Sequence, residues 1–545
     1  MYKGSLCIVL HAHLPYIRHP EHDDFLEENW FYEAAIETYI PLLKVFERLA
    51  NDVNDFRITI SLSPTLMEMM NDQLLRKRLR RHIEKLIDLA DYETYRTKKD
   101  PRFGPVARMY SEKYRKTLHL FEDVYKENIL RQFIDVQNAG NAEIITTAAT
   151  HAYLPLWSLF PEAIRAQIHT GSEFYRQHFG RKPAGLWLPE CGFCPGLDKF
   201  IQDEGMQYFF LATHGITHAK PSPPHGVHSP VICPSGPAAF GRDTETSHQV
   251  WSSLHGYPGD PFYRDFYRDI GYDLNVGHVR SFIHPYLTKT FTGFKYYRVT
   301  GRAETKKPYI ASRALMKAKE HADDFIRNRE RQIRSLSKKL GIHPLVNAMY
   351  DAELFGHWWY EGPAWLEHVF RGIHLVKRNF TTVTASEYLH TMNQGGISLP
   401  VCEPSMSSWG ARGYSDVWLN ESNDYVYRHL RKATERMIRL AVQFPDARGL
   451  LRKALNQAAR ELLLSQHSDW PFMIRSGKHA GYAATRLKGH LSAFTSIYHG
   501  IDTGNLKSWM IEGLESRDRI FRDIDYRVYG TGGEDRSQGS SLSKA

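Results

Sequence analysis

The chain has 545 residues, 42% hydrophobic and 24% charged, so it contains enough apolar side chains to build a large core. Its formal charge of +9 comes from 70 basic and 61 acidic residues without one dominant basic patch, which argues against a nucleic-acid partner. Five cysteines and the lack of any apolar run near 18 residues argue against a disulfide framework and a membrane span, so we expect a cytoplasmic protein.

Seven short apolar runs lead into polar residues and are separated by helical patterns. The runs are residues 6–10, 56–60, 142–146, 185–188, 208–211, 344–349 and, more weakly, 380–383. Strands that alternate with helices predict a parallel sheet. Polar residues at the C-terminal ends of buried strands favour a barrel with its site at that rim, with an open doubly wound sheet as the alternative. No glycine-rich phosphate loop follows the first run, so a nucleotide is not expected.

Two insertions interrupt this alternation. Residues 65–135 are rich in Leu, Lys, Arg and Glu and predict helices. Residues 215–300 are rich in Pro, Gly, His and Tyr and predict an irregular cap. A long charged helix is expected from Ile310 to Leu340, and the pattern is helical again from about residue 415.

Two carboxylates that follow predicted strands, Glu190 and Asp351, are the strongest catalytic candidates. Glycosyl transfer through an oxocarbenium-like transition state needs two carboxyl groups that flank the anomeric carbon. Neighbouring Trp and Pro residues would make both groups rigid and partly desolvated, which separates their pKa values. Glu353 competes with Asp351, because on an extended segment the two side chains point the same way. The 13% aromatic content suits a sugar-binding cleft or a large aromatic core.

Histidines supply a different possibility. His11 and His13 are two residues apart, so both face one side of a strand, a spacing that suits sugar hydroxyls or a metal ion. With His151 and His214 at other strand ends, a metal-dependent hydrolase or deacetylase is the alternative, and a glucan-binding protein without catalysis is a third. Cys191 and Cys194 have redox or zinc spacing, but no second such pair exists, and we interpret this pair as incidental.

Several ordered motifs resemble those of glycoside hydrolase family 57, with the closest resemblance to its 1,4-alpha-glucan branching enzymes. They extend from residue 5 to about residue 475. The matching segments are His11–Pro15, Gly140–Ile144, Trp187–Phe193, Phe240–Asp243, Gly256–Asp260, Tyr350–Trp359, Ser407–Gly410, Trp418–Asn420 and Ser468–Phe472. So many separate matches in one order make the resemblance highly specific.

The resemblance implies an α/β fold with three parts. Residues 1–395 would form an incomplete (β/α)7 barrel, residues 396–528 a C-terminal α-helical domain that completes the cleft, and residues 529–545 a disordered, Gly- and Ser-rich tail. It also implies a retaining mechanism on α-1,4-glucans such as amylose or glycogen, without a metal or another cofactor. No membrane partner is expected, and the chain would be a monomer or a weak homo-oligomer.

The resemblance also implies roles for individual residues. Glu190 is similar to the nucleophile of the family and Asp351 to its acid/base. The residues that resemble those around the −1 sugar are His11, His13, His151 and Asp469. Those that lie at matching aromatic or glucan-contacting positions are Trp409 and Trp418 first, and then Trp30, Trp358, Trp359, Trp470 and Tyr257.

One position departs from the pattern of the branching members. They carry a tyrosine on a mobile loop over the site, which is thought to favour transfer over hydrolysis. The corresponding loop is His225–Pro230, no Tyr occurs between Tyr208 and Tyr257, and His228 takes the place of the tyrosine. Imidazole has a smaller stacking surface than phenol, so an amylase-like hydrolase of the same architecture is the alternative.

Overall fold

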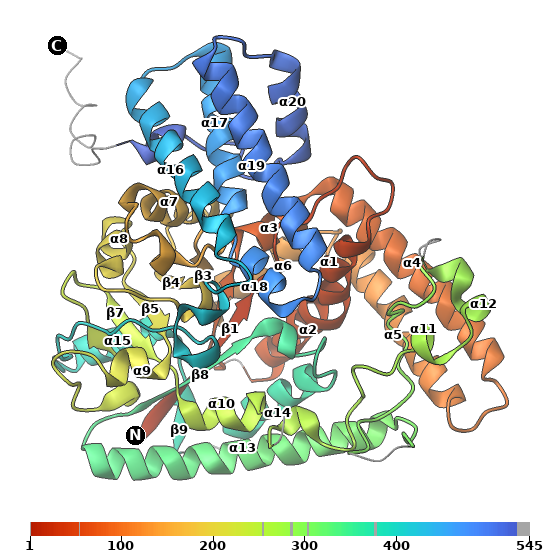
Figure 1. The fold of residues 1–545 in the computed structure, drawn as a ribbon. Helices are drawn as coiled ribbons and strands as arrows, with labels where there is room; N and C mark the ends of the chain where they lie inside the picture. The colour runs from red at the N-terminus through yellow and green to blue at the C-terminus, as the bar shows by residue number, and fades with distance from the viewer. Residues whose placement is uncertain are drawn as a thin grey trace, which may run out of the picture.

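The computed structural model describes residues 2–53, 55–252, 255–283, 287–301, 305–374 and 379–530 (Figure 1). Within these residues the centre is a curled parallel sheet of seven strands in the order β7-β5-β4-β3-β2-β1-β8. Its strands are β1 Gly4–Ala12, β2 Ile58–Leu62, β3 Ala142–Thr147, β4 Gly185–Trp187, β5 Tyr208–Leu211, β7 Ala238–Gly241 and β8 Leu345–Asp351. A short strand, β6 (Val231–Ile232), runs antiparallel to β7, and β9 (Phe380–Thr382) pairs with the start of β1.

The two ends of the curled sheet approach each other without forming a continuous ladder. The backbone N–H of Asp243 donates to the carbonyl of Asn347 at 3.0 Å, and the Asn347 side-chain amide donates to the Gly241 carbonyl at 3.3 Å. This is the predicted incomplete barrel. The seven predicted strands all form, but the weak run at 380–383 is β9, outside the barrel path. The seventh barrel strand is β7, which lies inside the segment predicted as an irregular cap.

The central strand β1 brings residues of its two neighbouring strands to the same level at the rim of the barrel. All nine of its residues are buried, because β2 and β8 flank it and helices cover the sheet. His11 lies opposite Ser61 of β2 and opposite Asp351 of β8. The inner face of the barrel is filled by aromatic and sulfur-containing side chains, including those of Cys7, Trp187, Phe210, Phe240 and Met349. Polar groups are therefore concentrated at the rim.

Helices precede, follow or separate the strands. The predicted helical insertion consists of α3 Pro64–Asn71, α4 Gln73–Arg96, α5 Gly104–His119, η3 Leu120–Val124 and α6 Ile129–Asn138. Ser63 and Asp72 start α3 and α4 by accepting hydrogen bonds from the backbone N–H groups three residues later. The other elements up to β5 are η1 Leu26–Glu28, α1 Asn29–Ala34, η2 Ala35–Tyr39, α2 Ile40–Asp52, η4 Leu154–Trp157, α7 Pro161–Phe179, η5 Pro189–Cys191 and α8 Leu197–Asp203.

The expected cap is only partly irregular. Besides β6 and β7 it contains α9 Thr213–Thr217, η6 Gly226–His228, α10 Thr244–Trp251, η7 Tyr257–Gly259, α11 Ile270–Asp273, α12 Val276–Val279 and η8 Arg280–Phe282. Its second half packs on the helical insertion, where the Tyr296 hydroxyl donates to Glu93 of α4 at 2.6 Å. The long charged helix, α13 Ala311–Leu340, ends at Gly341 (φ 67°) and runs across the base of the molecule in Figure 1. The remaining elements before the C-terminal helices are η9 Ala352–Leu354, α14 Gly362–His374, α15 Ala385–Gln394, η10 Ala411–Gly413 and η11 Ser415–Val417.

The C-terminal helices stand together against the barrel (Figure 1). They are α16 Tyr425–Gln443, α17 Gly449–Ser465, α18 Asp469–Ser476, α19 Ala480–Asp502, α20 Ser508–Arg517 and η12 Tyr526–Tyr529. Tyr529 is fully buried, so the tail predicted for residues 529–545 does not begin at 529, and residues 531–545 lie outside the described residues. Among the helices in the described ranges, none combines the length and apolar character needed to cross a bilayer.

Candidate active site

Six polar side chains from six different strands meet at the C-terminal rim of the barrel. They come from residues at or just after the ends of these strands, namely His11 (β1), Ser61 (β2), His151 (β3), Glu190 (β4), Arg242 (β7) and Asp351 (β8). Barrels of this type place their active sites at this end, because every strand delivers its last side chain to the same opening. The arrangement matches the site that the strand ends predict.

Glu190 is held from several directions. It lies in η5 with φ 60° and ψ 21°, a left-handed conformation that is costly for a residue with a side chain and is typical of functional sites. Trp409 donates its indole N–H to Oε2 at 2.8 Å, and Ser468 donates to Oε1 at 3.2 Å. Burial raises the pKa of Glu190 to about 7, while the hydrogen bond from Trp409 acts in the opposite direction.

Asp351 ends β8 and has a different environment. Burial is the main factor that raises its pKa well above the usual range, and the neighbouring carboxylates of Glu353 and Glu190 raise it further, while Arg242 opposes them. Within the described residues its carboxylate has no hydrogen-bond partner. Glu353, in contrast, accepts from the Tyr39 hydroxyl at 2.5 Å and from the His13 backbone N–H at 3.1 Å. The geometry therefore leaves Asp351, rather than Glu353, free to meet a ligand.

A chain of hydrogen bonds leads from β2 to Glu190. Ser61 Oγ lies 3.2 Å from His11 Nδ1, the Nε2 atoms of His11 and His151 are 3.0 Å apart, and His151 Nδ1 lies 2.9 Å from Ser468 Oγ. Burial lowers the pKa of both histidines well below the usual range, so each ring is neutral and carries one proton. Because Ser468 donates to Glu190, it accepts from His151. His151 then accepts from His11, and His11 from Ser61. This series of hydrogen bonds thus fixes the tautomers of His11 and His151.

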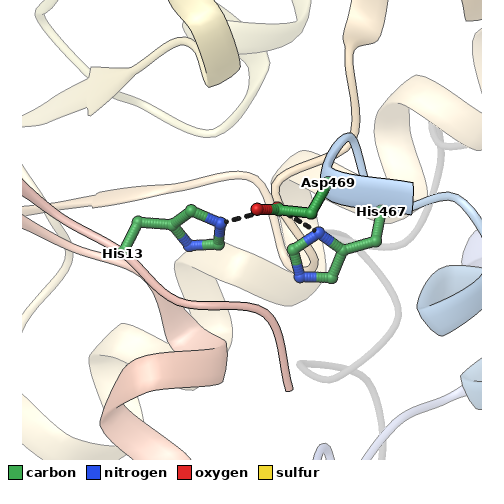
Figure 2. A group of neighbouring side chains, drawn as sticks. All are labelled: His13, His467 and Asp469. Carbon is green, nitrogen blue, oxygen red and sulfur yellow. Dashed lines mark hydrogen bonds and ion pairs between the residues drawn. The ribbon is translucent and has the colours of Figure 1, made fainter. Parts of the chain in front are cut away.

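Asp469 and its neighbours enter the rim from the helical domain. Asp469 Oδ2 lies 3.0 Å from His13 Nε2 and 2.8 Å from His467 Nδ1 (Figure 2). Burial opposes ionisation of Asp469, but the two imidazoles beside it hold its pKa well below the usual range. The His13 ring stacks on His151 at 3.8 Å between centroids. The predicted residues His11, His13, His151 and Asp469 therefore form one cluster next to Glu190.

Three of the predicted tryptophans keep an accessible face near this cluster. Trp409 is half-buried beside Glu190 and has the Arg242 guanidinium 5.4 Å from its ring centroid. Trp30, also half-buried, contacts His479 and Tyr482 of the helical domain edge-on. Trp358 is 48% exposed, and its ring lies tilted against that of Phe266 with the centroids 4.3 Å apart. Flat rings with exposed faces are suited to stack against sugars.

Four other aromatic candidates do not line the cleft. Trp418 is 1% exposed and stacks on Tyr153 at 4.3 Å, so it has no ring face open to a glucan. Trp359 and Trp470 are likewise buried core residues. Tyr257 donates its hydroxyl to Asp324 of α13 at 2.9 Å, so its ring packs on the outside of the barrel. The prediction of a cleft contact is wrong for Trp418 and Tyr257.

His228 does not lie over the site either. Its imidazole lies close to the backbone of Leu345, the first residue of β8, whereas Asp351 is the last. Six residue-to-residue steps of about 3.3 Å separate these two residues by about 20 Å along the strand. This segment lies toward the N-terminal end of the barrel strands, away from the rim. β6 starts three residues after His228, and its first residue pairs with Ala239 near the start of β7. The prediction that His228 replaces a tyrosine over the site is wrong.

Sequence reasoning missed some of the residues that the structure brings to the site. Arg242 and Ser468 lie in two of the matching motifs but have no predicted role, and His467 directly precedes one of those motifs. The His11 ring also stacks on Trp187 at 4.6 Å. Arg242 follows β7 in the same way that Glu190 follows β4, so its signal was a strand end that was not recognised as such.

Comparison with known proteins places these features in context. The family model for glycosyl hydrolase family 57 matches residues 7–400, and a model for the C-terminal part of 1,4-alpha-glucan branching enzymes matches residues 429–529. A 1,4-alpha-glucan branching enzyme of Thermococcus kodakarensis is 33% identical, over 96% of this chain and 78% of that protein.

Two solved structures resemble the whole chain. One is the alpha-amylase AmyC from Thermotoga maritima, with 41% identity, a TM-score of 0.90 and coverage of 97% of this chain and 99% of that one. The other is a branching enzyme from Pyrococcus horikoshii, with 31% identity, a TM-score of 0.86 and coverage of 97% of both chains. The match to one fold over nearly the full length of each agrees with the barrel and helical domain described above.

Proposed function

The chain belongs to glycosyl hydrolase family 57, and on that basis we propose that it is a 1,4-alpha-glucan branching enzyme, which cleaves α-1,4 linkages and forms α-1,6 linkages in glycogen-type polymers. One observation carries the choice of branching. The segment that matches the branching-enzyme C-terminal model, residues 429–529, delivers Ser468 and Asp469 to the cleft, where Ser468 hydrogen-bonds Glu190. The part of the chain typical of branching enzymes is thus built into the site.

In the proposed first step, a glucan lies across the rim and Asp351 protonates the glycosidic oxygen while Glu190 attacks the anomeric carbon. The bond to the leaving chain breaks, and a covalent glycosyl-enzyme forms on Glu190. The environments of the two carboxyls support this division. The pKa of Asp351 is raised well above the usual range by burial and by two neighbouring carboxylates, which suits an acid, whereas Glu190 receives two hydrogen bonds that stabilise its charged form.

In the second step Asp351 acts as the base. It takes the proton from the 6-hydroxyl of another glucan, whose oxygen attacks the anomeric carbon and releases Glu190 as carboxylate. Two displacements retain the α configuration. We expect the carboxyl groups of Glu190 and Asp351 to lie roughly 5–6 Å apart, as double displacement requires. No cofactor takes part in this scheme.

Hydrolysis is the second candidate, because the alpha-amylase AmyC is one of the structures that this chain resembles over its full length. The same covalent intermediate would then be released by water. The segment between Tyr208 and Tyr257 contains no tyrosine, and His228 does not lie near the rim. This segment therefore lacks the group expected to favour transfer. The metal-dependent deacetylase considered from the histidine spacing gains no support from the comparisons.

Product analysis on amylose decides between the two outcomes. A branching enzyme lowers the iodine colour, creates linkages that a debranching enzyme cleaves, and produces few reducing ends. Abundant short reducing sugars without α-1,6 linkages would instead establish hydrolysis. A cytoplasmic location, a role in glycogen synthesis and a monomer or weak homo-oligomer without nucleic-acid or membrane partners stay predictions.

A further inference from the structure

The contact between the helical domain and the barrel has the geometry of a metal site. His13 Nε2, His467 Nδ1 and a carboxylate oxygen of Asp469 all lie within 4.8 Å of one another. The two nitrogens are 3.0 and 2.8 Å from Oδ2 (Figure 2). Ligand atoms bound at about 2.0–2.2 Å to one zinc ion are separated from each other by roughly 3 Å. Each imidazole nitrogen therefore already lies at ligand spacing from the carboxylate oxygen.

Binding of an ion here would cost few existing interactions. His467 is fully buried; its Nδ1 contacts Asp469, and its Nε2 has no hydrogen bond within the described residues. His13 Nδ1 is buried and unsatisfied in the same way. Metal binding through one ring nitrogen of a neutral imidazole needs only a shift of the proton to the other nitrogen. In both rings the ion would replace the contact with Asp469 Oδ2, and the proton would move to a nitrogen that has no partner in the described structure.

The donor set of the group also suits a cation. Imidazole nitrogens and carboxylate oxygens are ligands that zinc accepts in proteins. The side chain of Asp469 is 21% exposed, which leaves an open coordination position toward the cleft.

A second cluster of three His, Asp or Glu side chains lacks these features. Glu461, His490 and Asp518 in the helical domain also lie within 4.8 Å of one another. Arg517 contacts Asp518 at 2.6 Å and Glu461 at 3.4 Å, and the cluster is fully buried. Its negative charge is already neutralised by an arginine and no ligand position is open. This cluster therefore serves as an internal control.

We infer that His13, His467 and Asp469 bind one zinc-type divalent cation, and that the bound cation and the glucan exclude each other. Two imidazoles, one carboxylate and an open position are a donor set that zinc accepts. The exclusion rests on the proposed function, because it requires the sugar next to Glu190 to contact His13 and Asp469. The ion would act as an inhibitor, since the carboxylate chemistry at Glu190 and Asp351 does not use it.

The test is a metal titration of the full chain after dialysis against a chelator. Zn²⁺ is followed by calorimetry and Co²⁺ by its visible absorption, which reports nitrogen and oxygen ligation directly. We expect one equivalent per chain in the wild type and an affinity at least about tenfold lower in His467→Gln, the lower end of the losses seen when a metal-supporting residue is removed. Asp469→Asn, which is nearly isosteric, should lose the site as well. His490→Gln should bind like the wild type.

Wild-type affinity in both His467→Gln and Asp469→Asn, or an equal loss in His490→Gln, would overturn the site. Competition is read separately by repeating the Zn²⁺ titration of the wild type with maltopentaose. An unchanged apparent affinity at saturating maltopentaose would overturn the exclusion. Because binding is measured without turnover, a chain that proves inactive on amylose refutes the proposed function and leaves the metal result intact.

Discussion

Trp409 holds Glu190 by both its side chain and its backbone. The indole N–H donates to Oε2 at 2.8 Å, and the Trp409 backbone N–H donates to the Glu190 carbonyl at 3.0 Å. Glu190 has a left-handed backbone conformation, which costs free energy and persists only where the surroundings enforce it. The pair of hydrogen bonds from a segment 219 residues away provides that enforcement. The orientation and the charge of the proposed nucleophile therefore depend on this tryptophan together with Ser468.

Replacing Trp409 by Phe should shift the pH dependence of the reaction. The indole N–H stabilises the charged form of Glu190 and lowers its pKa, so its loss raises the pKa. Since Glu190 must be ionised to attack, the acidic limb of kcat/KM should move to higher pH. A hydrogen bond to a charged group is worth about 1.5–3 kcal/mol, which corresponds to a roughly ten- to hundredfold loss of kcat/KM at neutral pH.

Trp358→Phe is the matched control for this change. Trp358 is exposed and packs against Phe266, and no hydrogen bond links its ring to Glu190 in the described structure. Its replacement should raise KM without moving the acidic limb. Equal acidic limbs for wild type and Trp409→Phe would show that the indole does not set the charge of Glu190.

The proposed roles of Asp351 and Glu353 are separated by a pair of isosteric changes. Asp351→Asn removes the general acid, and such catalysis contributes typically 10²–10⁴-fold, so kcat on amylose should fall by about that factor. In Glu353→Gln the amide oxygen can still accept from Tyr39 and from the His13 backbone, as the carboxylate does. This variant should lose less than about tenfold.

Substrates with an activated leaving group sharpen this comparison. A leaving group that needs no protonation should restore most of the first step in Asp351→Asn, while Glu190→Gln should stay inactive on it. A result in which Glu353→Gln is the more damaged variant, and is rescued by the activated substrate, would transfer the acid role to Glu353.

Much of the fold is readable from sequence because buried parallel strands are short, continuous apolar runs. Val9 and its neighbours in β1 are an example. β7 escaped this rule because Ala238–Gly241 is mostly small residues and lies within a Pro- and Gly-rich segment. Because β7 is not recognisable from the sequence, Arg242, which follows it, is not predicted as a rim residue.

Loop conformations and contacts between the barrel and the helical domain limit how much of the site the sequence predicts. Glu190 and Asp351 follow strands, so the barrel geometry brings them to one rim without further information. His13 and Asp469 are 456 residues apart and meet only because the helical domain docks on the barrel. The burial of Trp418 and the position of His228 along the barrel axis depend on loop conformations, which hydrophobic periodicity does not predict. These are the positions at which sequence prediction failed.

His228→Tyr should leave the balance of transfer and hydrolysis unchanged. Residue 228 contacts Leu345 at the start of β8, about 20 Å along the strand from Asp351, so a phenol there does not reach the intermediate. The number of α-1,6 linkages formed per reducing end released from amylose should equal that of the wild type. A clear rise in this ratio would place residue 228 over the site after all.

Glu190 should destabilise the folded chain at neutral and alkaline pH. Its pKa is raised by burial from 4.5 to about 7, so the folded state holds this proton to a higher pH than the unfolded state does. Below pH 4.5 both states are protonated and there is no cost. As the pH rises through the interval up to about 7, ionisation increasingly favours unfolding, by up to about 3 kcal/mol above it.

Glu190→Gln removes this ionisation and keeps an oxygen that accepts from Trp409. The variant should therefore have a higher Tm than the wild type at pH 8, and the difference should shrink toward zero near pH 4. Thermal unfolding of both proteins across this pH range measures the difference. Glu112→Gln, at an exposed position on α5, is the control and should show no pH-dependent gain. A Tm difference for Glu190→Gln that is the same at pH 4 and pH 8 would mean that Glu190 titrates alike in the folded and unfolded states. The environment proposed to tune the nucleophile would then have no energetic effect on it.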